Sequence, residues 1–164
     1  MKPRANKMRV LAIDPGFDRL GIAILEGDPS QPTLVWSDCV LPPKGKREER
    51  LAAVLAAVAL AIETYSPALL ALETLFFSTN KKTAIGVAEA RGAILAAAGS
   101  AGIPLREFSP QQVKLAVTGY GAADKRAVAL MIPRLLVLPP KKKRLDDEFD
   151  AIAVGIAALA ERSL

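Results

Sequence analysis

The stretch VLAIDPGFDRLGIAIL, residues 10–25, decides the fold that we expect for this chain. One apolar run ends at Asp14, a Pro-Gly pair follows it, and a second apolar run comes after a short polar segment. Aliphatic runs separated by Pro-Gly are typical of β-strands joined by a turn, which predicts strands over 9–14 and 19–25. A third such run, 33–41, follows the turn-forming segment EGDPS. The chain should therefore begin with a three-stranded antiparallel meander.

Helices rich in alanine and leucine alternate with short apolar strands in the rest of the sequence. Ser109 and Pro110 are suited to begin one of these helices as its cap and first-turn proline. Meander strands followed by alternating helix and strand predict an α/β fold, a mixed sheet with helices on both faces, as in ribonuclease H-like folds. We expect helices over 46–65, 82–98, 122–136 and from about 144 to the end, and strands over 68–72 and 103–108.

Composition and charge narrow the classes of function. The chain has 164 residues, of which 51% are hydrophobic, enough for one domain with a buried core. We expect a loose tail over 1–7 and a single ribonuclease H-like domain over 8–164. The net charge of +5 favours a polyanionic partner, while the absence of histidine excludes Ser-His-Asp and HExxH chemistry. The longest apolar stretch, 51–62, is shorter than the roughly 20 residues that span a bilayer. We expect a cytoplasmic protein without a membrane role.

Four carboxylates stand at positions that could bring them together. Asp14 and Glu73 each end an apolar strand, and Asp147 and Asp150 lie three residues apart at a helix start, on one face of that helix. Each has an ordinary explanation, as a turn former, a solvated strand end or a first-turn acid that favours the helix dipole. Together they would supply oxygen ligands for two Mg²⁺ or Mn²⁺ ions. Asp146 is the second choice for the fourth ligand.

Four segments resemble the RuvC family of Holliday junction resolvases, nucleases of the ribonuclease H-like and retroviral-integrase superfamily. They are residues 10–25, ALETLFFSTNKKTAIGVAEARGAIL at 71–95, FSPQQVKLAVTGYGAADKRAV at 108–128 and LDDEFDAIAVGIAAL at 145–159. The resemblance covers nearly the whole chain from Met8.

The resemblance implies a role for each acidic position. Asp14 matches the first-strand aspartate, Glu73 the glutamate of an ExxF segment, and Asp147 with Asp150 the terminal DxxD pair. Some family members have histidine at the position of Asp147, which this chain replaces with a carboxylate. The implied cofactors are Mg²⁺ or Mn²⁺, two per active site. Lys114 and Lys125 match family lysines near the active site. Their expected roles are to bind the scissile phosphate and to stabilise transition-state charge.

Other residues are candidates for DNA contact. Phe76 matches a family phenylalanine near the crossover, and with Phe77 it precedes a polar, basic segment, so we expect stacking on junction bases. The alternative is that one or both pack in the core. The run Lys141, Lys142, Lys143 and Arg144 is a further candidate for backbone contact and also fits an ordinary surface loop. Lys81, Lys82 and Arg91 are weaker candidates.

The function that the resemblance implies is junction resolution in recombination and repair. A homodimer would nick two strands of like polarity symmetrically in four-way junction DNA, with a branch-migration helicase complex as a further partner. The helix over 82–98 resembles the family's dimer-interface helix. Two alternatives stay open, a ribonuclease H-like nuclease that acts on another substrate such as an RNA–DNA hybrid, and a junction-binding protein that does not cut.

Overall fold

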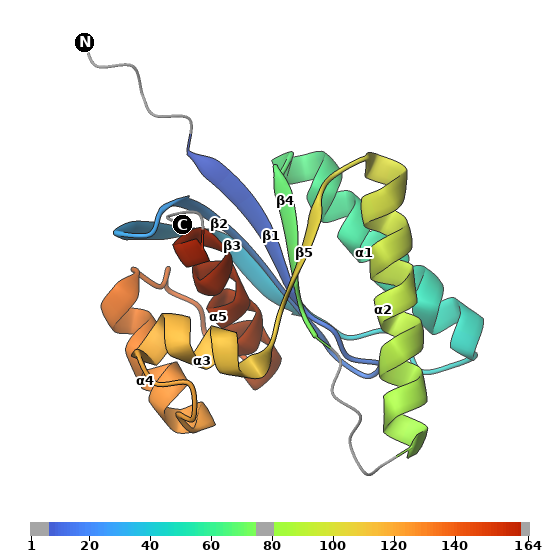
Figure 1. The fold of residues 1–164 in the computed structure, drawn as a ribbon. Helices are drawn as coiled ribbons and strands as arrows, with labels where there is room; N and C mark the ends of the chain where they lie inside the picture. Colours follow the sequence, from blue (N-terminus) through green and yellow to red (C-terminus); the bar gives the residue numbers. More distant parts are fainter. Residues whose placement is uncertain (1–6, 75–80, 162–164) are drawn as a thin grey trace.

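The computed structural model describes residues 7–74 and 81–161, which form one five-stranded sheet with helices on both faces (Figure 1). The strand order is β3-β2-β1-β4-β5. The first three strands pair antiparallel, and β4 and β5 add to β1 in parallel, so the predicted meander and mixed sheet are confirmed. In chain order the elements are β1 Met8–Asp14, β2 Leu20–Asp28, β3 Gln31–Val40, α1 Arg47–Tyr65, β4 Leu69–Glu73, α2 Lys81–Ala101, β5 Leu105–Phe108, α3 Pro110–Thr118, α4 Lys125–Leu135 and α5 Asp146–Glu161.

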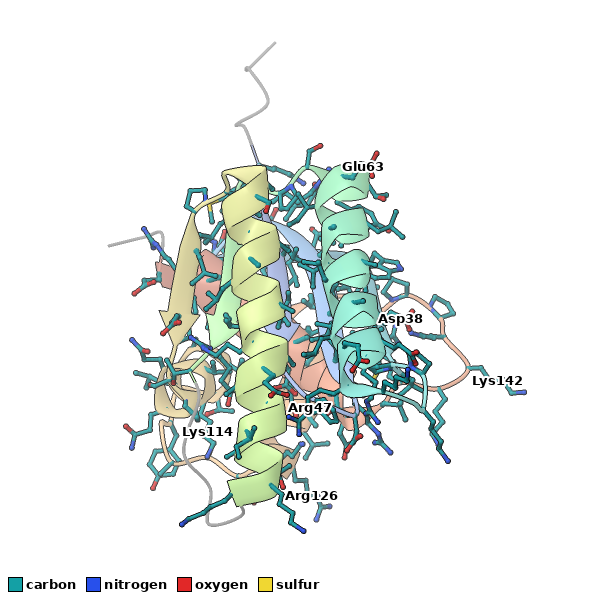
Figure 2. The ribbon with its side chains drawn as sticks, turned by 90° about the vertical axis from the view of Figure 1, so that its right-hand side faces the viewer. Asp38, Arg47, Glu63, Lys114, Arg126 and Lys142 are labelled. Atoms are coloured by element: carbon teal, nitrogen blue, oxygen red, sulfur yellow. The ribbon has the colours of Figure 1, made fainter. Side chains whose placement is uncertain are left out.

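Alternation along the central strand divides the core into two layers. Val10 and Ala12 of β1 pack in the layer that contains α3, α4 and α5, whereas Leu11 and Ile13 pack in the layer of α1 and α2. Because successive strand residues point to opposite faces and both faces are covered, β1 is apolar at nearly every position. Figure 2 shows α1 and α2 side by side over their face of the sheet.

Helix α5 lies closest to the centre of the sheet, where it contacts β1 and β2. Ten of its sixteen residues are buried, so it is apolar on almost every side. Small residues allow the close approach: a Cβ added at Gly21 of β2 would stand 1.8 Å from the carbonyl oxygen of Asp147, and one at Gly155 would stand 2.4 Å from the Leu25 side chain. The first turn of α5 therefore packs directly against the backbone of β2.

Several helices and strands begin or end at other residues than predicted, because of local hydrogen bonds and backbone conformation. The hairpin between β2 and β3 is tighter than expected because the Asp28 carboxylate accepts hydrogen bonds from the backbone N–H groups of Ser30 and Gln31. Gly99 does not end α2, which continues to Ala101 before Gly102 takes a left-handed conformation. Asp124, capping the N–H of Ala127, makes α4 begin at Lys125 rather than at 122, and α5 begins at 146 rather than 144.

The Ser109–Pro110 start of α3 is confirmed. The Ser109 hydroxyl accepts a hydrogen bond from the backbone N–H of Gln112, and the Gln112 side chain accepts one from the N–H of Ser109. Among the helices within residues 7–74 and 81–161, none combines the length and apolar character that crossing a membrane requires.

We predict that Gly21→Ala lowers the free energy of unfolding by roughly 1–3 kcal/mol, because its methyl group would overlap the Asp147 carbonyl and push α5 off the sheet. Urea denaturation measures the loss. Gly99→Ala is the matched control, since an added Cβ there meets nothing within 4 Å and alanine favours a helix, so its stability should hold or rise. Equal stability of the two variants would contradict the close packing of α5.

Candidate active site

Three of the predicted carboxylates line one pocket of about 290 Å³ at the end of the sheet: Asp14, Glu73 and Asp150. Both predicted lysines, Lys114 and Lys125, line the same pocket. Residues from two strands and three helices thus meet around it, although they are scattered over most of the chain.

Strand geometry explains why Asp14 and Glu73 are neighbours. β1 and β4 are parallel, with Ile13 opposite Leu72, so the next residue of each strand projects at the same sheet edge. Ile13 and Leu72 both belong to the core layer of α1 and α2. Because side chains alternate along a strand, Asp14 and Glu73 both point to the opposite face, which α5 covers.

Arg91 of α2 secures the end of β4. Its guanidinium donates a hydrogen bond to the Glu73 carbonyl oxygen at 2.9 Å and forms an ion pair with Glu107 of β5. Sequence reasoning missed this role. The signal available for it was a single arginine within an alanine-rich helix.

The carboxylates share a region of strong negative potential. Burial raises the pKa of Asp14 to about 8, and the charges of Asp150, Glu73 and Asp147 contribute to the increase. Burial also raises the pKa values of Glu73 and Asp150, with the charge of Asp150 adding to the effect on Glu73. Asp14 therefore holds its proton to a higher pH than an ordinary aspartate does.

Lys125 supplies positive charge inside this cluster. Its ammonium nitrogen lies 2.9 Å from Oδ2 of Asp150, and that hydrogen bond raises the pKa of Lys125. The same ammonium acts to lower the pKa values of Asp14, Glu73 and Asp150 against the effect of burial. Lys114 also acts to lower the pKa of Glu73.

Asp147 and Asp146 occupy different surroundings. Asp147 Oδ2 lies 3.7 Å from a guanidinium nitrogen of Arg19, and its charge reaches Asp14. Asp146 is exposed and lines an adjoining pocket of about 160 Å³, which shares Lys125 and Asp150 with the carboxylate pocket. The charge of Asp147 acts on Asp14 and Asp150, whereas that of Asp146 acts on Lys125 and Asp150, so the choice of a fourth ligand stays a prediction. Arg19 was missed from the sequence, where its position at the start of the second strand was the only signal.

The carboxylates have the donor chemistry that Mg²⁺ or Mn²⁺ prefers, because the cluster offers oxygen and no nitrogen or sulfur ligand. Within the described part of the chain, however, no three acidic or thiol side chains are arranged so that they could hold a metal ion. Asp150 is directed toward Lys125 and Asp147 toward Arg19.

The candidate DNA contacts divide into three groups. Phe76 and Phe77 lie outside the described residues, so their roles stay predictions. Lys81 and Lys82 are exposed in the first turn of α2. In the run 141–144, the two middle lysines are exposed, whereas Lys141 and Arg144 form ion pairs with Glu148.

Comparisons with known proteins agree over most of the chain. The family model described as crossover junction endodeoxyribonuclease RuvC matches residues 10–158. The RuvC of Moorella thermoacetica is 41% identical over 150 residues, covering 91% of this chain and 89% of that protein, and that of Thermotoga petrophila is 38% identical, covering 90% of each.

Solved structures of two Holliday junction proteins are also similar to this chain. Thermus thermophilus RuvC in complex with Holliday junction substrate superposes with a TM-score of 0.84 at 33% identity, covering 92% of both chains. The yeast mitochondrial Holliday junction resolvase Ydc2 shares the fold, with a TM-score of 0.68 at 12% identity, covering 96% of this chain and 82% of its own.

We predict that Asp14→Asn stabilises the protein at alkaline pH in the presence of chelator. The pKa of Asp14 lies near 8 in the folded protein and at an ordinary 3.8 in the unfolded chain, so the folded state binds more protons between these values. Its contribution to the free energy of unfolding therefore falls as pH rises from about 4 to 8. At pH 8 the variant should exceed the parent by on the order of 5 kcal/mol, and near pH 4 the difference should vanish.

Urea denaturation across this pH range measures the difference. Glu63→Gln serves as the control, because Glu63 is exposed on α1 and should show no such trend. A pH-independent difference between Asp14→Asn and the parent would show that Asp14 titrates normally.

Proposed function

The chain belongs to the RuvC family of crossover junction endodeoxyribonucleases, and we propose that it resolves Holliday junctions by metal-dependent hydrolysis of the DNA backbone. The observation that supports this most directly is the pocket in which Asp14, Glu73 and Asp150 meet Lys114 and Lys125. The similar Thermus thermophilus protein is described in complex with a Holliday junction substrate.

The proposed cofactors are Mg²⁺ or Mn²⁺, two per active site, held by Asp14, Glu73, Asp150 and Asp147. When bound, such ions lower the pKa of an attacking water and stabilise the leaving 3′-oxygen. Asp14 must lose its proton before it can act as a ligand, and Lys125 favours this loss because its charge lowers the pKa of that carboxyl. The carboxylates contribute charge and orientation, and no covalent enzyme intermediate is needed.

The two lysines would bind the scissile phosphate. Lys114 comes from α3 and Lys125 from the first residue of α4, and both reach the carboxylate pocket. Positive groups positioned where charge develops stabilise a phosphoryl transition state more than the ground state. Lys125 also pairs with Asp150, so it is placed to contact both the carboxylate cluster and a phosphate.

We also propose that the protein acts as a homodimer in the cytoplasm, where chromosomal DNA is available. Paired, symmetric nicks are most simply made by two active sites, and one chain contributes one set of Asp14, Glu73 and Asp150 around their shared pocket. The exposed side chains of Ile85 and Leu95 on α2 provide apolar surface for such a contact. A branch-migration helicase complex is a further proposed partner.

The test of the proposed function incubates the protein with a four-way junction, a linear duplex and an RNA–DNA hybrid, each in Mn²⁺, Mg²⁺ or chelator. We expect paired nicks in the junction that depend on metal. Asp14→Asn should abolish cleavage while junction binding persists, because it removes a ligand without adding bulk. Preferred cutting of the hybrid would support another ribonuclease H-like nuclease, and binding without cutting would support a non-catalytic protein.

Lys125→Met should lower kcat for junction cleavage by roughly 10²-fold, because it removes a cation from the site of transition-state charge. Its effect on junction affinity should be within about threefold, since a single phosphate contact contributes little to a large DNA interface. Arg126→Met removes the same charge from the next residue, which does not line the carboxylate pocket. Similar kcat values for the two variants would remove Lys125 from the catalytic group.

A further inference from the structure

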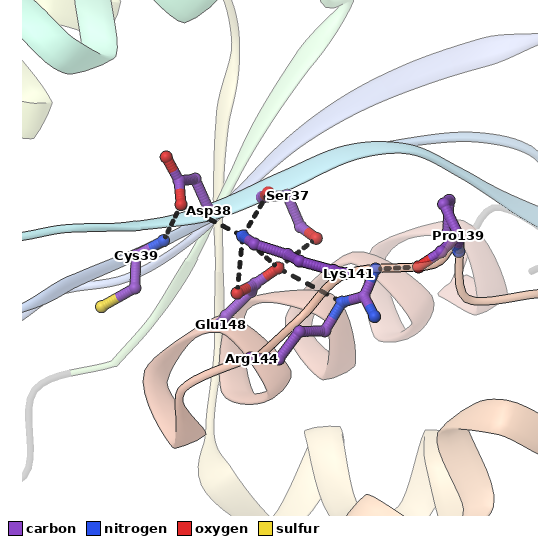
Figure 3. Close-up of polar contacts among 7 residues, drawn as sticks. All are labelled: Ser37, Asp38, Cys39, Pro139, Lys141, Arg144 and Glu148. Atoms are coloured by element: carbon purple, nitrogen blue, oxygen red, sulfur yellow. Dashed lines mark hydrogen bonds and ion pairs between the residues drawn. The ribbon is translucent and has the colours of Figure 1, made fainter.

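Glu148 is a buried carboxylate that the proposed mechanism does not use. Its side chain is 1% exposed, although it stands between Asp147 and Asp150 in the first turn of α5. Helical residues are separated by about 100° around the axis, so Glu148 points away from the direction that Asp150 takes. It faces the edge strand β3 and the loop before α5 rather than the carboxylate pocket (Figure 3).

Three groups surround the Glu148 carboxylate (Figure 3). The Ser37 hydroxyl of β3 donates a hydrogen bond to Oε1 at 2.6 Å. The Lys141 ammonium lies 3.1 Å from both carboxylate oxygens, and Nε of Arg144 lies 3.3 Å from Oε1. A buried carboxylate is therefore matched by two cations and a hydroxyl group.

The same cations extend the cluster to β3 and the loop. Lys141 contacts the Ser37 carbonyl oxygen at 3.3 Å and the Asp38 carboxylate at 3.1 Å, and Arg144 donates to the Pro139 carbonyl oxygen at 2.7 Å. The cluster thus ties the first turn of α5 to β3 on one side and to the 139–144 loop on the other.

The energetic cost of burying Glu148 suggests that the cluster fixes how α5 is oriented relative to β3. Burying a carboxylate costs several kcal/mol, and ion pairs offset that cost only when their geometry is well defined. An apolar side chain would stabilise the first turn equally well without requiring one arrangement of partners. The carboxylate, by contrast, is satisfied only when α5 has one rotation and depth relative to β3.

We propose that Glu148 is a positioning residue, which orients the first turn of α5 so that Asp150 lines the pocket of Asp14 and Glu73, with Asp147 beside Arg19. This inference rests on the proposed function of the carboxylate pocket. The close contact between Gly21 and the Asp147 carbonyl holds the turn against β2, and Glu148 holds its outer side against β3. Rotation of the turn would displace both aspartates together.

The four basic residues 141–144 fall into two pairs with different surroundings. Lys141 and Arg144 bind Glu148 within the protein. Lys142 and Lys143 are exposed, and Figure 2 shows Lys142 projecting away from the body of the protein. Only these two lysines are free to add phosphate contacts without disturbing α5.

The first experiment compares Glu148→Gln with Glu161→Gln. Both remove one negative charge from α5, but Glu161 lies at the exposed far end, where it pairs with Arg106. For Glu148→Gln we expect the Mn²⁺ concentration at half-maximal junction cleavage to rise roughly tenfold, as for other groups that orient metal ligands. The increase in Tm on adding Mn²⁺ should shrink, while junction affinity in chelator should hold or improve. Glu161→Gln should match the parent in all three.

The second experiment substitutes residues of the 141–144 loop. Because Lys141 pairs with the buried Glu148 carboxylate, the Tm of each variant in chelator is measured first to establish that it folds. Lys141→Met should raise the Mn²⁺ requirement, and Lys141→Arg should restore it because arginine can still pair with Glu148. Lys142→Met removes the same charge and should weaken junction binding without altering the Mn²⁺ requirement. Equal Mn²⁺ requirements in Lys141→Met and Lys142→Met, or a parent-like requirement in Glu148→Gln, would overturn the positioning role.

The two proposals fail in different ways. A parent protein that cuts no junction in any metal would contradict the proposed function. The Mn²⁺-dependent change in Tm would still compare Glu148→Gln with Glu161→Gln in that case, and equal changes would contradict the positioning role separately.

Discussion

The packing of α5 against the centre of the sheet is the contact on which the rest of the structure depends. The helix is buried along most of its length, and small residues on both sides of the interface bring its backbone close to β2. Burial of this apolar helix drives folding, and it also determines where the first turn lies. The same contact therefore stabilises the protein and brings Asp150 to the edge of the sheet where Asp14 and Glu73 end.

This arrangement concentrates negative charge at a cost to stability. Burial and mutual repulsion raise the pKa values of Asp14, Glu73 and Asp150, so the ionised cluster opposes folding. Lys125 relieves part of that repulsion. The apolar core beneath the cluster supplies the remaining stability, as is common where a functional site departs from the most stable arrangement.

The acidic residues near the start of α5 have different surroundings although they are close in sequence. Asp150 lines the pocket, Asp147 pairs with Arg19, and Glu148 is enclosed by Ser37, Lys141 and Arg144. All of them complement the positive end of the helix dipole, which explains why the segment is acidic but not what each residue does. Their distinct surroundings follow from the 100° step of the helix, which turns successive side chains toward the sheet edge, β2 and β3.

The sequence by itself determined the order and type of the elements, the mixed sheet and the family. Periodicity, turn residues and motifs each depend on residues that are close together in the chain, so they can be recognised without the structure. It also predicted that Asp14 and Glu73 each end a strand, whereas the parallel pairing that makes them neighbours came from the structure. Only the tertiary structure decided that Lys141 and Arg144 pair with Glu148, that Arg91 holds the end of β4 and that Arg19 lies beside Asp147. The Arg91 and Arg19 contacts join residues that are distant in the chain, and Glu148 joins α5 to Ser37 of β3, so these partners depend on how closely α2 and α5 approach the sheet.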